Sequence, residues 1–483
     1  MKMGRGVLIG GLLAATALVS PQVALARSAA KPAKSVEASV EARLDKLESE
    51  VSSLRGDLDA AKAENEQLKK RAADAEARAL AAEGQAAEAN RRVAAVEAKP
   101  TPAPAAVADG FKSGNTQVRL GGYIKLIGSS TRFSDGEVAT NTLGRDFYLP
   151  QAIPTGGAPS AHNTDFTAKQ SRFWLNLDTN IAGHAVKGYL EFDFQTAPGT
   201  QGSQRTTNGY NPAMRRAYMQ VDRWTFGQDW STFQYTGALP ESTDYVGGAE
   251  GTVFVRQPLI RYSAPLGKGA TLHVSVENPE SGTANLGSPA LIENGDDRLP
   301  DLAARLAWTG KRGELSLAGL VRQVRVETAG ISADTGGFGV SLGGKLFLNA
   351  AKTGDARIMV TYGTNIGRYV GLNFAPDAVY VPAGNRLESA SVFAVIGAVR
   401  VPLAAGLRAN LMGSYQTVDY SNNLAPVSIS GFNKQAWSIA GNLFYSPVKN
   451  IDLGIEYRHG QRELVSGADG STDRIDVVAK YSF

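Results

Sequence analysis

The sequence has no cysteine and only four histidines among its 483 residues. Without cysteine there can be no disulfide scaffold, thiolate metal site or cysteine nucleophile. The histidines are scattered and form no H-E-x-x-H motif, so no metal site is expected. They are His162, His184, His273 and His459. The net charge of +4, from 50 basic and 46 acidic residues, does not favour nucleic-acid binding.

Aromatic residues and long apolar runs are missing from the start of the chain. All Phe, Tyr and Trp residues lie after Gly110, so the first 110 residues cannot form a compact core. The apolar run over residues 7–19 is too short for a membrane-spanning helix, which needs about 20 residues. Lys2 and Arg5 precede this run and Ala24-Leu25-Ala26 follows it, which predicts a signal peptide over residues 1–26.

After a short segment, residues 27–39, a heptad pattern runs over residues 40–96 and predicts an α-helical coiled coil. The oligomerisation residues on its seam include Leu44, Leu47, Val51, Leu54, Leu58, Asn65 and Leu68. Asn65 is the one polar seam residue, which fits a selector of register and oligomer state. A single solvated helix is the alternative, because the seam from Ala72 to Ala89 is all alanine. The heptads alone leave dimer and trimer open, and a Pro/Ala-rich linker over residues 97–115 follows.

From Thr116 to Phe483 the apolar residues alternate with period two. Sixteen strands are predicted, at 116–128, 172–181, 186–194, 214–221, 223–228, 255–263, 270–277, 302–308, 314–326, 337–348, 356–365, 389–401, 406–418, 434–445, 450–459 and 473–483. Tight turns alternate with long loops rich in Gly, Pro, Asn and Asp. These features predict an all-β transmembrane barrel of 16 antiparallel strands over residues 116–483. A soluble β-sandwich is the alternative, but it would not explain the regular alternation of loop lengths.

An even strand number puts both barrel ends on the short-turn side, so the coiled coil is expected in the periplasm. The last strand ends in Tyr481 and Phe483, which resembles the C-terminal signal read by the barrel-assembly machinery. Outer-membrane lipid and lipopolysaccharide are then expected partners. The pattern G-x-S-x-G at Gly339–Gly343 falls inside an alternating strand and is treated as a coincidence. We expect neither an enzyme nor a cofactor.

If the apolar face meets lipid, the opposite face lines the lumen. Its predicted basic members are Arg119, Lys125, Arg172, Lys187, Arg216, Arg261, Arg305, Arg322, Lys345, Arg357, Arg400, Arg408, Arg458 and Lys480. Its predicted acidic members are Asp178, Glu191, Asp193, Glu314, Asp452, Glu456 and Asp476. A twofold excess of basic groups predicts a preference for small anions. Alternatively, the arginines neutralise lumen carboxylates and brace the wall.

Residues 229–254 form the third long loop, the position that folds into the barrel in general porins. This loop carries Asp229, Trp230, Glu241, Asp244 and Glu250. Folded inward, its acids are expected to face the arginines across a constriction and to create a transverse field. Such a field would orient a dipolar or dianionic solute.

Several stretches carry a resemblance to a known family. They are Gly122-Tyr123-Ile124-Lys125, Arg216-Ala217-Tyr218, the segment from Phe226 to Phe233 (FGQDWSTF) and the segment from Arg256 to Tyr262 (RQPLIRY). With the predicted signal peptide, coil and barrel, the chain resembles the DcaP-like porins. The resemblance implies a homotrimer joined by a trimeric coiled coil and uptake of small anions such as dicarboxylates. The alternatives are a general, phosphate-type or sugar-type porin, or a tether between outer membrane and cell wall.

Overall fold

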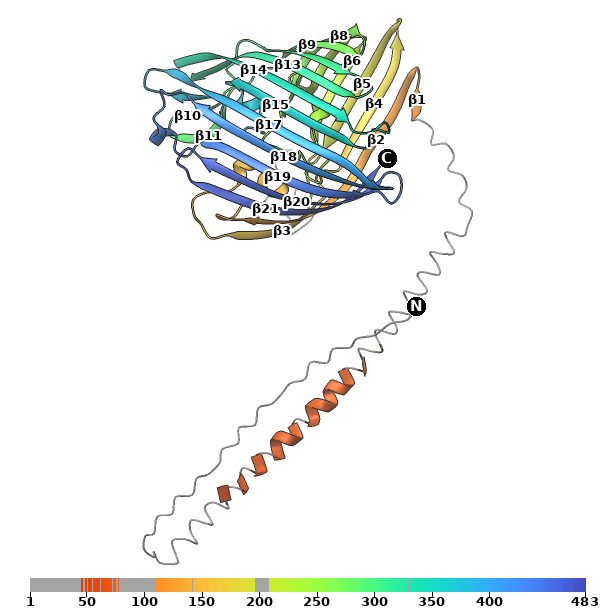
Figure 1. Cartoon of the computed structure of the whole chain (residues 1–483), viewed down its shortest axis with the longest axis vertical. Coiled ribbons are helices and arrows are strands. Elements are labelled where there is room, and N and C mark those ends of the chain that lie inside the picture. Colours follow the sequence, from red (N-terminus) through yellow and green to blue (C-terminus); the bar gives the residue numbers. More distant parts are fainter. Residues whose placement is uncertain are drawn as a thin grey trace, which may run out of the picture. The chain divides into compact units, whose positions relative to one another are not determined.

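The computed structural model describes residues 110–140, 142–195, 208–328 and 331–483, together with parts of the stretch between 45 and 77. The chain divides into two units, Met1–Ala105 and Ala106–Phe483 (Figure 1). The predicted signal peptide and the oligomerisation residues Leu44, Leu47 and Leu54 lie outside the described residues.

In the first unit, every described residue between 45 and 77 is helical and exposed. The seam residues Val51, Leu58 and Leu68 are 45%, 55% and 52% exposed in the single chain, and Asn65 is also exposed. Lys69 and Glu66 form an ion pair along the helix at 2.8 Å. Within the described part of the chain, no helix is long and apolar enough to span a membrane.

The second unit is a closed barrel of sixteen antiparallel strands (Figure 1). The strands are β2 (Thr116–Phe133), β4 (Arg172–Ile181), β5 (His184–Asp193), β6 (Ala213–Val221), β7 (Trp224–Trp230), β8 (Arg256–Gly267), β9 (Ala270–Glu277), β12 (Asp301–Thr309), β13 (Gly313–Thr328), β14 (Ile331–Phe347), β15 (Asp355–Thr364), β17 (Arg386–Ala404), β18 (Leu407–Tyr420), β19 (Asn433–Tyr445), β20 (Ile451–Leu464) and β21 (Asp469–Ser482). Each pairs with the next in this order, and β21 pairs with β2 to close the barrel. All sixteen predicted strands are confirmed.

Short elements also occur outside the sixteen strands. They are β1 (Phe111–Ser113), β3 (Ala161–Thr167), β10 (Gly282–Asn285), β11 (Ser288–Glu293), β16 (Ala378–Val381), α2 (Leu143–Asp146), η1 (Pro150–Ala152), η2 (Thr236–Ala238), η3 (Gly367–Tyr369) and η4 (Pro426–Ile429). β1 lies within residues 97–115, which the sequence assigned to the linker. Its residues pair with the start of β2, Phe111 opposite Val118, so this end of the segment is part of the sheet.

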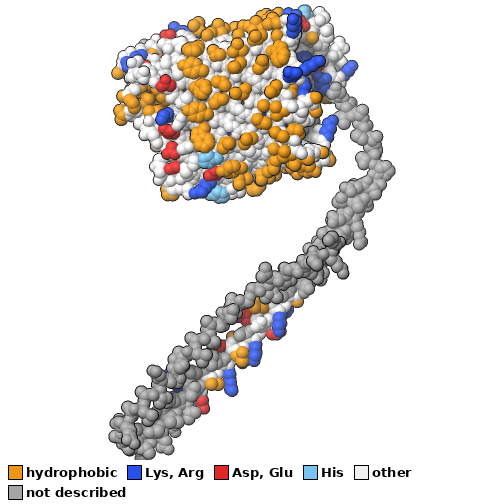
Figure 2. Space-filling model, viewed as in Figure 1, with side chains coloured by type: hydrophobic (Ala, Val, Ile, Leu, Met, Phe, Trp, Pro, Cys, Tyr) orange, Lys and Arg blue, Asp and Glu red, His pale blue; other side chains and the backbone are white. Residues whose placement is uncertain are grey.

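The two faces of the barrel differ as the alternation predicts. The outward face carries exposed Leu, Ile, Val, Phe and Tyr side chains and is largely hydrophobic in Figure 2. Ala182 and Gly183, in the tight turn between β4 and β5, have φ of 51° and 90°. Positive φ at both central residues gives the turn the twist that a two-residue hairpin needs.

The core lies inside the barrel, where loop residues pack on small side chains of the strands. Phe233, Val253 and Tyr369 from the loops are fully buried with Ala390 and Ala394 of β17. The small inward residues leave room for these larger rings. Two loop segments meet there, because Val253 pairs with Val370 in an isolated antiparallel bridge.

Candidate functional site in the barrel interior

Residues 231–255, here called the inner loop, connect β7 to β8 and contact strands on the far side of the barrel. The Tyr235 hydroxyl donates a hydrogen bond of 2.9 Å to Glu314 of β13. Gly251 lies directly on β17, because a Cβ at this position would be 2.3 Å from the carbonyl oxygen of Val395. Asp229 and Trp230, predicted as loop residues, are the last residues of β7.

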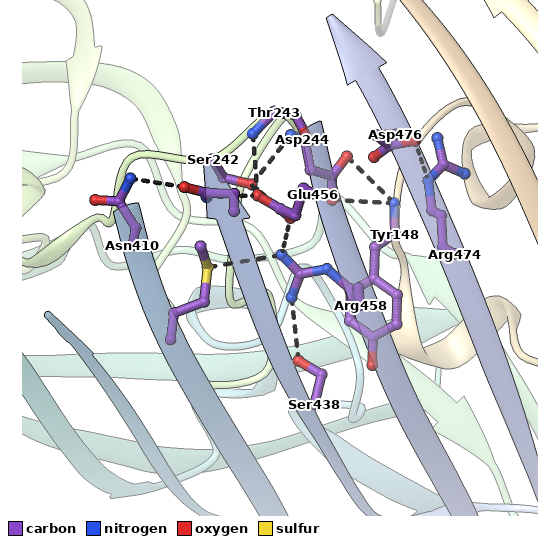
Figure 3. Close-up of polar contacts among 12 residues, drawn as sticks. Tyr148, Ser242, Thr243, Asp244, Asn410, Ser438, Glu456, Arg458, Arg474 and Asp476 are labelled. Atoms are coloured by element: carbon purple, nitrogen blue, oxygen red, sulfur yellow. Dashed lines mark hydrogen bonds and ion pairs between the residues drawn. The ribbon is translucent and has the colours of Figure 1, made fainter. Parts of the chain in front are cut away.

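Glu456 of β20 holds the middle of the inner loop (Figure 3). Its carboxylate accepts hydrogen bonds from the Ser242 hydroxyl at 2.7 Å and from the Thr243 backbone N–H at 3.1 Å. The same carboxylate pairs with Arg458 at 2.8 Å and accepts from the Asn442 amide at 2.9 Å. Arg458 and Glu456 are both buried, so the pair is shielded from water.

Glu250 forms a second attachment of the inner loop. Its carboxylate is fully buried and accepts hydrogen bonds from Ser438 at 2.9 Å and from Ser414 and Tyr148. Ser414 and Ser438 lie on β18 and β19. We call β18 to β21 with β2 the latch wall, because these strands hold the middle of the inner loop.

Glu241 and Asp244 also point to the latch wall. Glu241 pairs with Arg408 at 2.6 Å. Asp244 accepts backbone hydrogen bonds from Tyr148 at 3.2 Å and Tyr245 at 2.8 Å, and burial raises the pKa of its carboxyl to about 6. Glu241 and Glu250 thus contact the latch wall, and Asp244 lies within electrostatic range of its Arg474 and Arg458, so these acids do not face the arginine wall across an open constriction. Backbone N–H groups and hydroxyls, which the alternation does not reveal, draw them there.

The opposite side, β4 to β9 with β12, is here called the arginine wall. Arg172 pairs with Asp193 at 3.2 Å, and Arg216 and Arg261 both pair with Asp229, Arg216 at 2.6 Å. The guanidinium of Arg216 also lies 4.7 Å from the ring centre of Tyr189. These contacts hold the guanidinium groups in fixed positions.

Arg215 joins the arginine wall although strand alternation puts it on the outer face. A β-bulge is responsible: Glu191 pairs with Arg216 and Phe192 with Met214, so Arg215 has no partner on β5. Its buried guanidinium instead pairs with Glu191 and Asp193, each at 2.7 Å. No local sequence signal marks this bulge.

Several predicted lumen cations are ion-paired and some are not. Among those paired with carboxylates are Arg119 with Asp178, Arg357 and Arg400 with Asp355, Arg408 and Lys480 with Asp452, and Arg322 with Asp377. In contrast, Lys125, Lys187, Arg305 and Lys345 form no ion pair with a described residue. Arg305 donates to the Gln234 carbonyl at 3.1 Å, and its Nε is buried without a hydrogen-bond partner. Lys125 donates to Gln170 and to the Thr243 carbonyl, both at 2.8 Å.

The predicted twofold excess of basic groups is smaller in the structure. The interior holds further carboxylates, from loops and strand ends, that the alternation did not place there: Asp229, Glu241, Asp244, Glu250, Glu277, Asp301, Asp355 and Asp377. Arg322 is fully buried and pairs with Asp377 at 2.8 Å, so it anchors a second inward loop at 365–377. Tyr369 of that loop donates to Asp301 at 2.6 Å.

Three other features named in the sequence analysis are the C-terminal aromatic residues, the G-x-S-x-G pattern and the histidines. Phe483 exchanges backbone hydrogen bonds with Gly122 of β2, and its ring centre lies 6.0 Å from that of Phe173 on the outer face. Tyr481 is on the same face. Ser341 lies within β14 and shares a hydrogen bond of 2.9 Å with Thr361. Among the residues that the structure describes, no group of three or more His, Asp or Glu side chains could hold a metal ion.

A closed barrel of sixteen strands with an apolar outer face, a charged interior and a loop folded inward defines the class of outer-membrane porins. The family model of the DcaP outer membrane protein matches residues 150–483. The chain belongs to the DcaP outer membrane protein family.

The chain is also similar to solved structures. The outer membrane channel DcaP of Acinetobacter baumannii is 28% identical with a TM-score of 0.64, and the match covers 77% of this chain and 99% of that chain. OmpT of Vibrio cholerae is 13% identical and Salmonella typhi OmpF in complex with daunomycin is 15% identical. Both have TM-scores of 0.47 and cover 77% of this chain and 99% of theirs. No curated protein matched in the sequence comparison.

Proposed function

We propose that this outer-membrane porin passes small hydrophilic solutes by diffusion and prefers anions such as dicarboxylates. The observation that supports the proposal is the position of Arg305. Its guanidinium is half-buried, donates to the Gln234 carbonyl of the inner loop and has no carboxylate partner among the described residues. A guanidinium without a carboxylate partner can bind a solute carboxylate without first breaking an ion pair.

Lys187 of β5 and Lys345 of β14 are two further basic residues of the channel that, like Arg305, have no carboxylate partner among the described residues. Both lie on the inward face, and neither forms an ion pair with a described residue. The unpaired cations offer an anion several attractive sites along the channel. Each site binds the anion weakly enough to release it. The ion pairs of Arg119, Arg172 and Arg261 reduce the contribution expected from those three arginines.

Reversal potentials in planar bilayers under a salt gradient test the proposal. We expect Arg305→Met to lower the anion-to-cation permeability ratio about two- to threefold, equivalent to about 0.5 kcal/mol. Arg305→Lys keeps the charge and is expected to retain most of the ratio. Arg119→Met/Asp178→Asn, which removes an ion pair without changing the net charge of the lumen, is the matched control.

Liposome swelling gives the solute class. Faster swelling with succinate than with a neutral sugar of similar size is expected. Equal rates for succinate and sugar, together with an unchanged ratio in Arg305→Met, would contradict the anion preference and favour a general porin.

The assembly that we infer is a homotrimer joined by a periplasmic coiled coil. The apolar seam residues Val51, Leu58 and Leu68 support it, because a lone helix leaves about half of each side chain in water. Native mass spectrometry of the full chain is expected to show trimers. Substituting Leu58 and Leu68 with aspartate is expected to weaken their association, whereas an unchanged subunit count would contradict a role of the coil.

A further inference from the structure

An apolar groove of about 660 Å³ lies on the outer surface of the barrel, across β2, β3 and β18 to β21. We call it the outer groove. Gly128 and Ala479 form its shallow floor, while Phe166, Leu443 and Tyr445 are among its taller walls. Phe166 is 71% exposed in the single chain, so its ring projects from the outer face toward lipid. β18 to β21 lie in front in Figure 1, and the same view in Figure 2 shows an apolar surface there.

The strand register orders the outward residues of this region into rows. Gly128 is paired with Phe166 on β3 and with Val477 on β21. Two residues further along β2, Ser130 is paired with Thr164 and Ile475. Because side chains alternate with period two, residues two apart share the outer face.

The next row is polar and closes one end of the outer groove. Arg132 of β2 is paired with His162 on β3 and with Asp473 on β21, and Asp473 is paired with His459 on β20. We call these four residues the polar row. Directly paired residues on one face lie about 4.5–5.5 Å apart, so the polar row can contact a single head group.

Within the polar row, Asp473 has hydrogen-bond partners, whereas the Arg132 side chain has no ion-pair partner among the described residues. Asp473 accepts hydrogen bonds from the Tyr457 hydroxyl at 2.7 Å and from the His459 ring at 2.8 Å. The His162 ring contacts Ser130 at 2.8 Å. Arg132 is exposed and forms no ion pair with a described residue. It acts on the neighbouring Asp473 only through electrostatic attraction, so its hydrogen-bond donors remain for an anion beside His162.

The depth of the polar row matches one leaflet of the membrane. It lies toward the end of the barrel that carries the long loops, which is the extracellular end of a porin. From Arg132 to Leu126, at the opposite end of the groove, six residues span about 20 Å, or about 15 Å of depth at a tilt of about 40°. This is about half of a hydrophobic band of about 25–30 Å. The polar row thus lies at the head groups and the outer groove lies among the acyl chains.

We propose that the outer groove and the polar row form a binding site for a phosphorylated, multiply acylated lipid of the outer leaflet, the chemistry of lipopolysaccharide. An acyl chain fills the groove between Phe166 and Leu443. A phosphate accepts the forked hydrogen bonds of Arg132, and His162 adds a third donor. The site is on the outer face and does not depend on the anion preference of the lumen.

Binding of lipid A to the delipidated full-length protein in detergent tests the site. Native mass spectrometry compares lipid A that carries its phosphates with the dephosphorylated form. We expect the phosphorylated form to bind about tenfold more tightly, the effect of one or two charge-assisted hydrogen bonds. Arg132→Ala is expected to lose most of this difference, and Arg132→Lys to keep part of it. Arg223→Ala, an exposed arginine in a tight turn at the opposite end of the barrel, is the matched control.

Filling the groove tests the acyl-chain part independently. Ala479→Phe is expected to weaken both forms of lipid A at least about fivefold while leaving the phosphate preference intact. Heat-modifiable mobility on gels verifies that each variant has folded, and His162→Ala on β3 offers a second variant outside the closed barrel.

Three results would overturn the proposal. Equal binding of the two lipid forms by the wild-type protein excludes the head-group contact. Competition by inorganic phosphate at similar concentration identifies a free-anion site. Loss of subunit association in Ala479→Phe with unchanged lipid binding identifies the outer groove as a contact between copies of the chain.

Discussion

The two sides of the barrel interior hold their charges differently. On the arginine wall, Arg172, Arg215, Arg216 and Arg261 pair with Glu191, Asp193 and Asp229, whereas Arg305 donates to a backbone carbonyl and has no carboxylate partner among the described residues. On the latch wall, Arg408, Arg458, Arg474 and Lys480 pair with Glu241, Glu456, Asp476 and Asp452, and the carboxylates of Glu456 and Glu250 take part in holding the inner loop.

This difference separates two tasks that the sequence had assigned to one set of arginines. Charged and polar groups of the latch wall hold the inner loop in place, so the ion pairs of this wall stabilise the fold. On the arginine wall, Arg305 has no carboxylate partner among the described residues, and this is the group on which the proposed anion preference rests.

Removing one arginine from each wall is the strongest test of this division. Arg458→Met leaves the buried carboxylate of Glu456 without its cation, and we expect the free energy of unfolding to fall by about 3–5 kcal/mol. Arg305→Met leaves no carboxylate unpaired and is expected to cost about 1 kcal/mol, the value of its hydrogen bond to Gln234. Denaturant unfolding in lipid vesicles, followed by tryptophan fluorescence, measures both.

The double variant Arg458→Met/Glu456→Gln serves as the control. Because it removes both charges, we expect it to recover part of the stability lost in Arg458→Met. Similar losses in Arg458→Met and Arg305→Met would show that the two walls do not differ as we describe.

Weakening the loop attachment is expected to have an intermediate effect. Glu250→Gln loses the charge that accepts hydrogen bonds from Ser414 and Ser438, at about 1.5–3 kcal/mol for a charged hydrogen bond. The middle of the inner loop should then move, which single-channel recording detects as current noise and a larger mean conductance. Glu277→Gln, which accepts from Thr232 at the root of the loop, should change the current less because strand pairing also holds the root. Unchanged current noise and conductance in Glu250→Gln would contradict the role of Glu250 in holding the inner loop.

The barrel itself follows from local sequence patterns. Alternation of apolar residues has period two wherever one face meets lipid, and a turn such as Ala182-Gly183 needs only its two neighbouring strands. These signals place all sixteen strands. The rest of the sheet is less visible, and β1 and β3 were missed because both are short and lie outside the regular repeat of strands.

The interior contacts could not be predicted in the same way. Ser242 and Glu456 are 214 positions apart, and nothing near either residue identifies the other. The inward position of Arg215 depends on a bulge opposite Phe192, which breaks the alternation used to assign faces. The alternation therefore indicates which residues of a strand share the inward face but not which of the basic ones have carboxylate partners.

The smallest effect that we expect is a pH dependence carried by Asp244 on the latch wall. Burial raises the pKa of this carboxyl from 3.8 to about 6, while Arg474 and Asp476 nearby act in opposite directions. Between these pH values the folded chain holds a proton that the unfolded chain has released, so stability should fall as the pH rises from about 3.8 to about 6 and should not change further with this group above about 6. Protonation also removes one negative charge near the latch wall, so the anion-to-cation permeability ratio should increase modestly as the pH falls from 7.5 to 5.

Asp244→Asn should abolish this part of the pH dependence in unfolding and reversal-potential measurements, whereas Asp419→Asn on the outer face should not. The same pH profile in Asp244→Asn and wild type would assign the titration to another group and leave the contrast between the walls resting on the ion pairs alone.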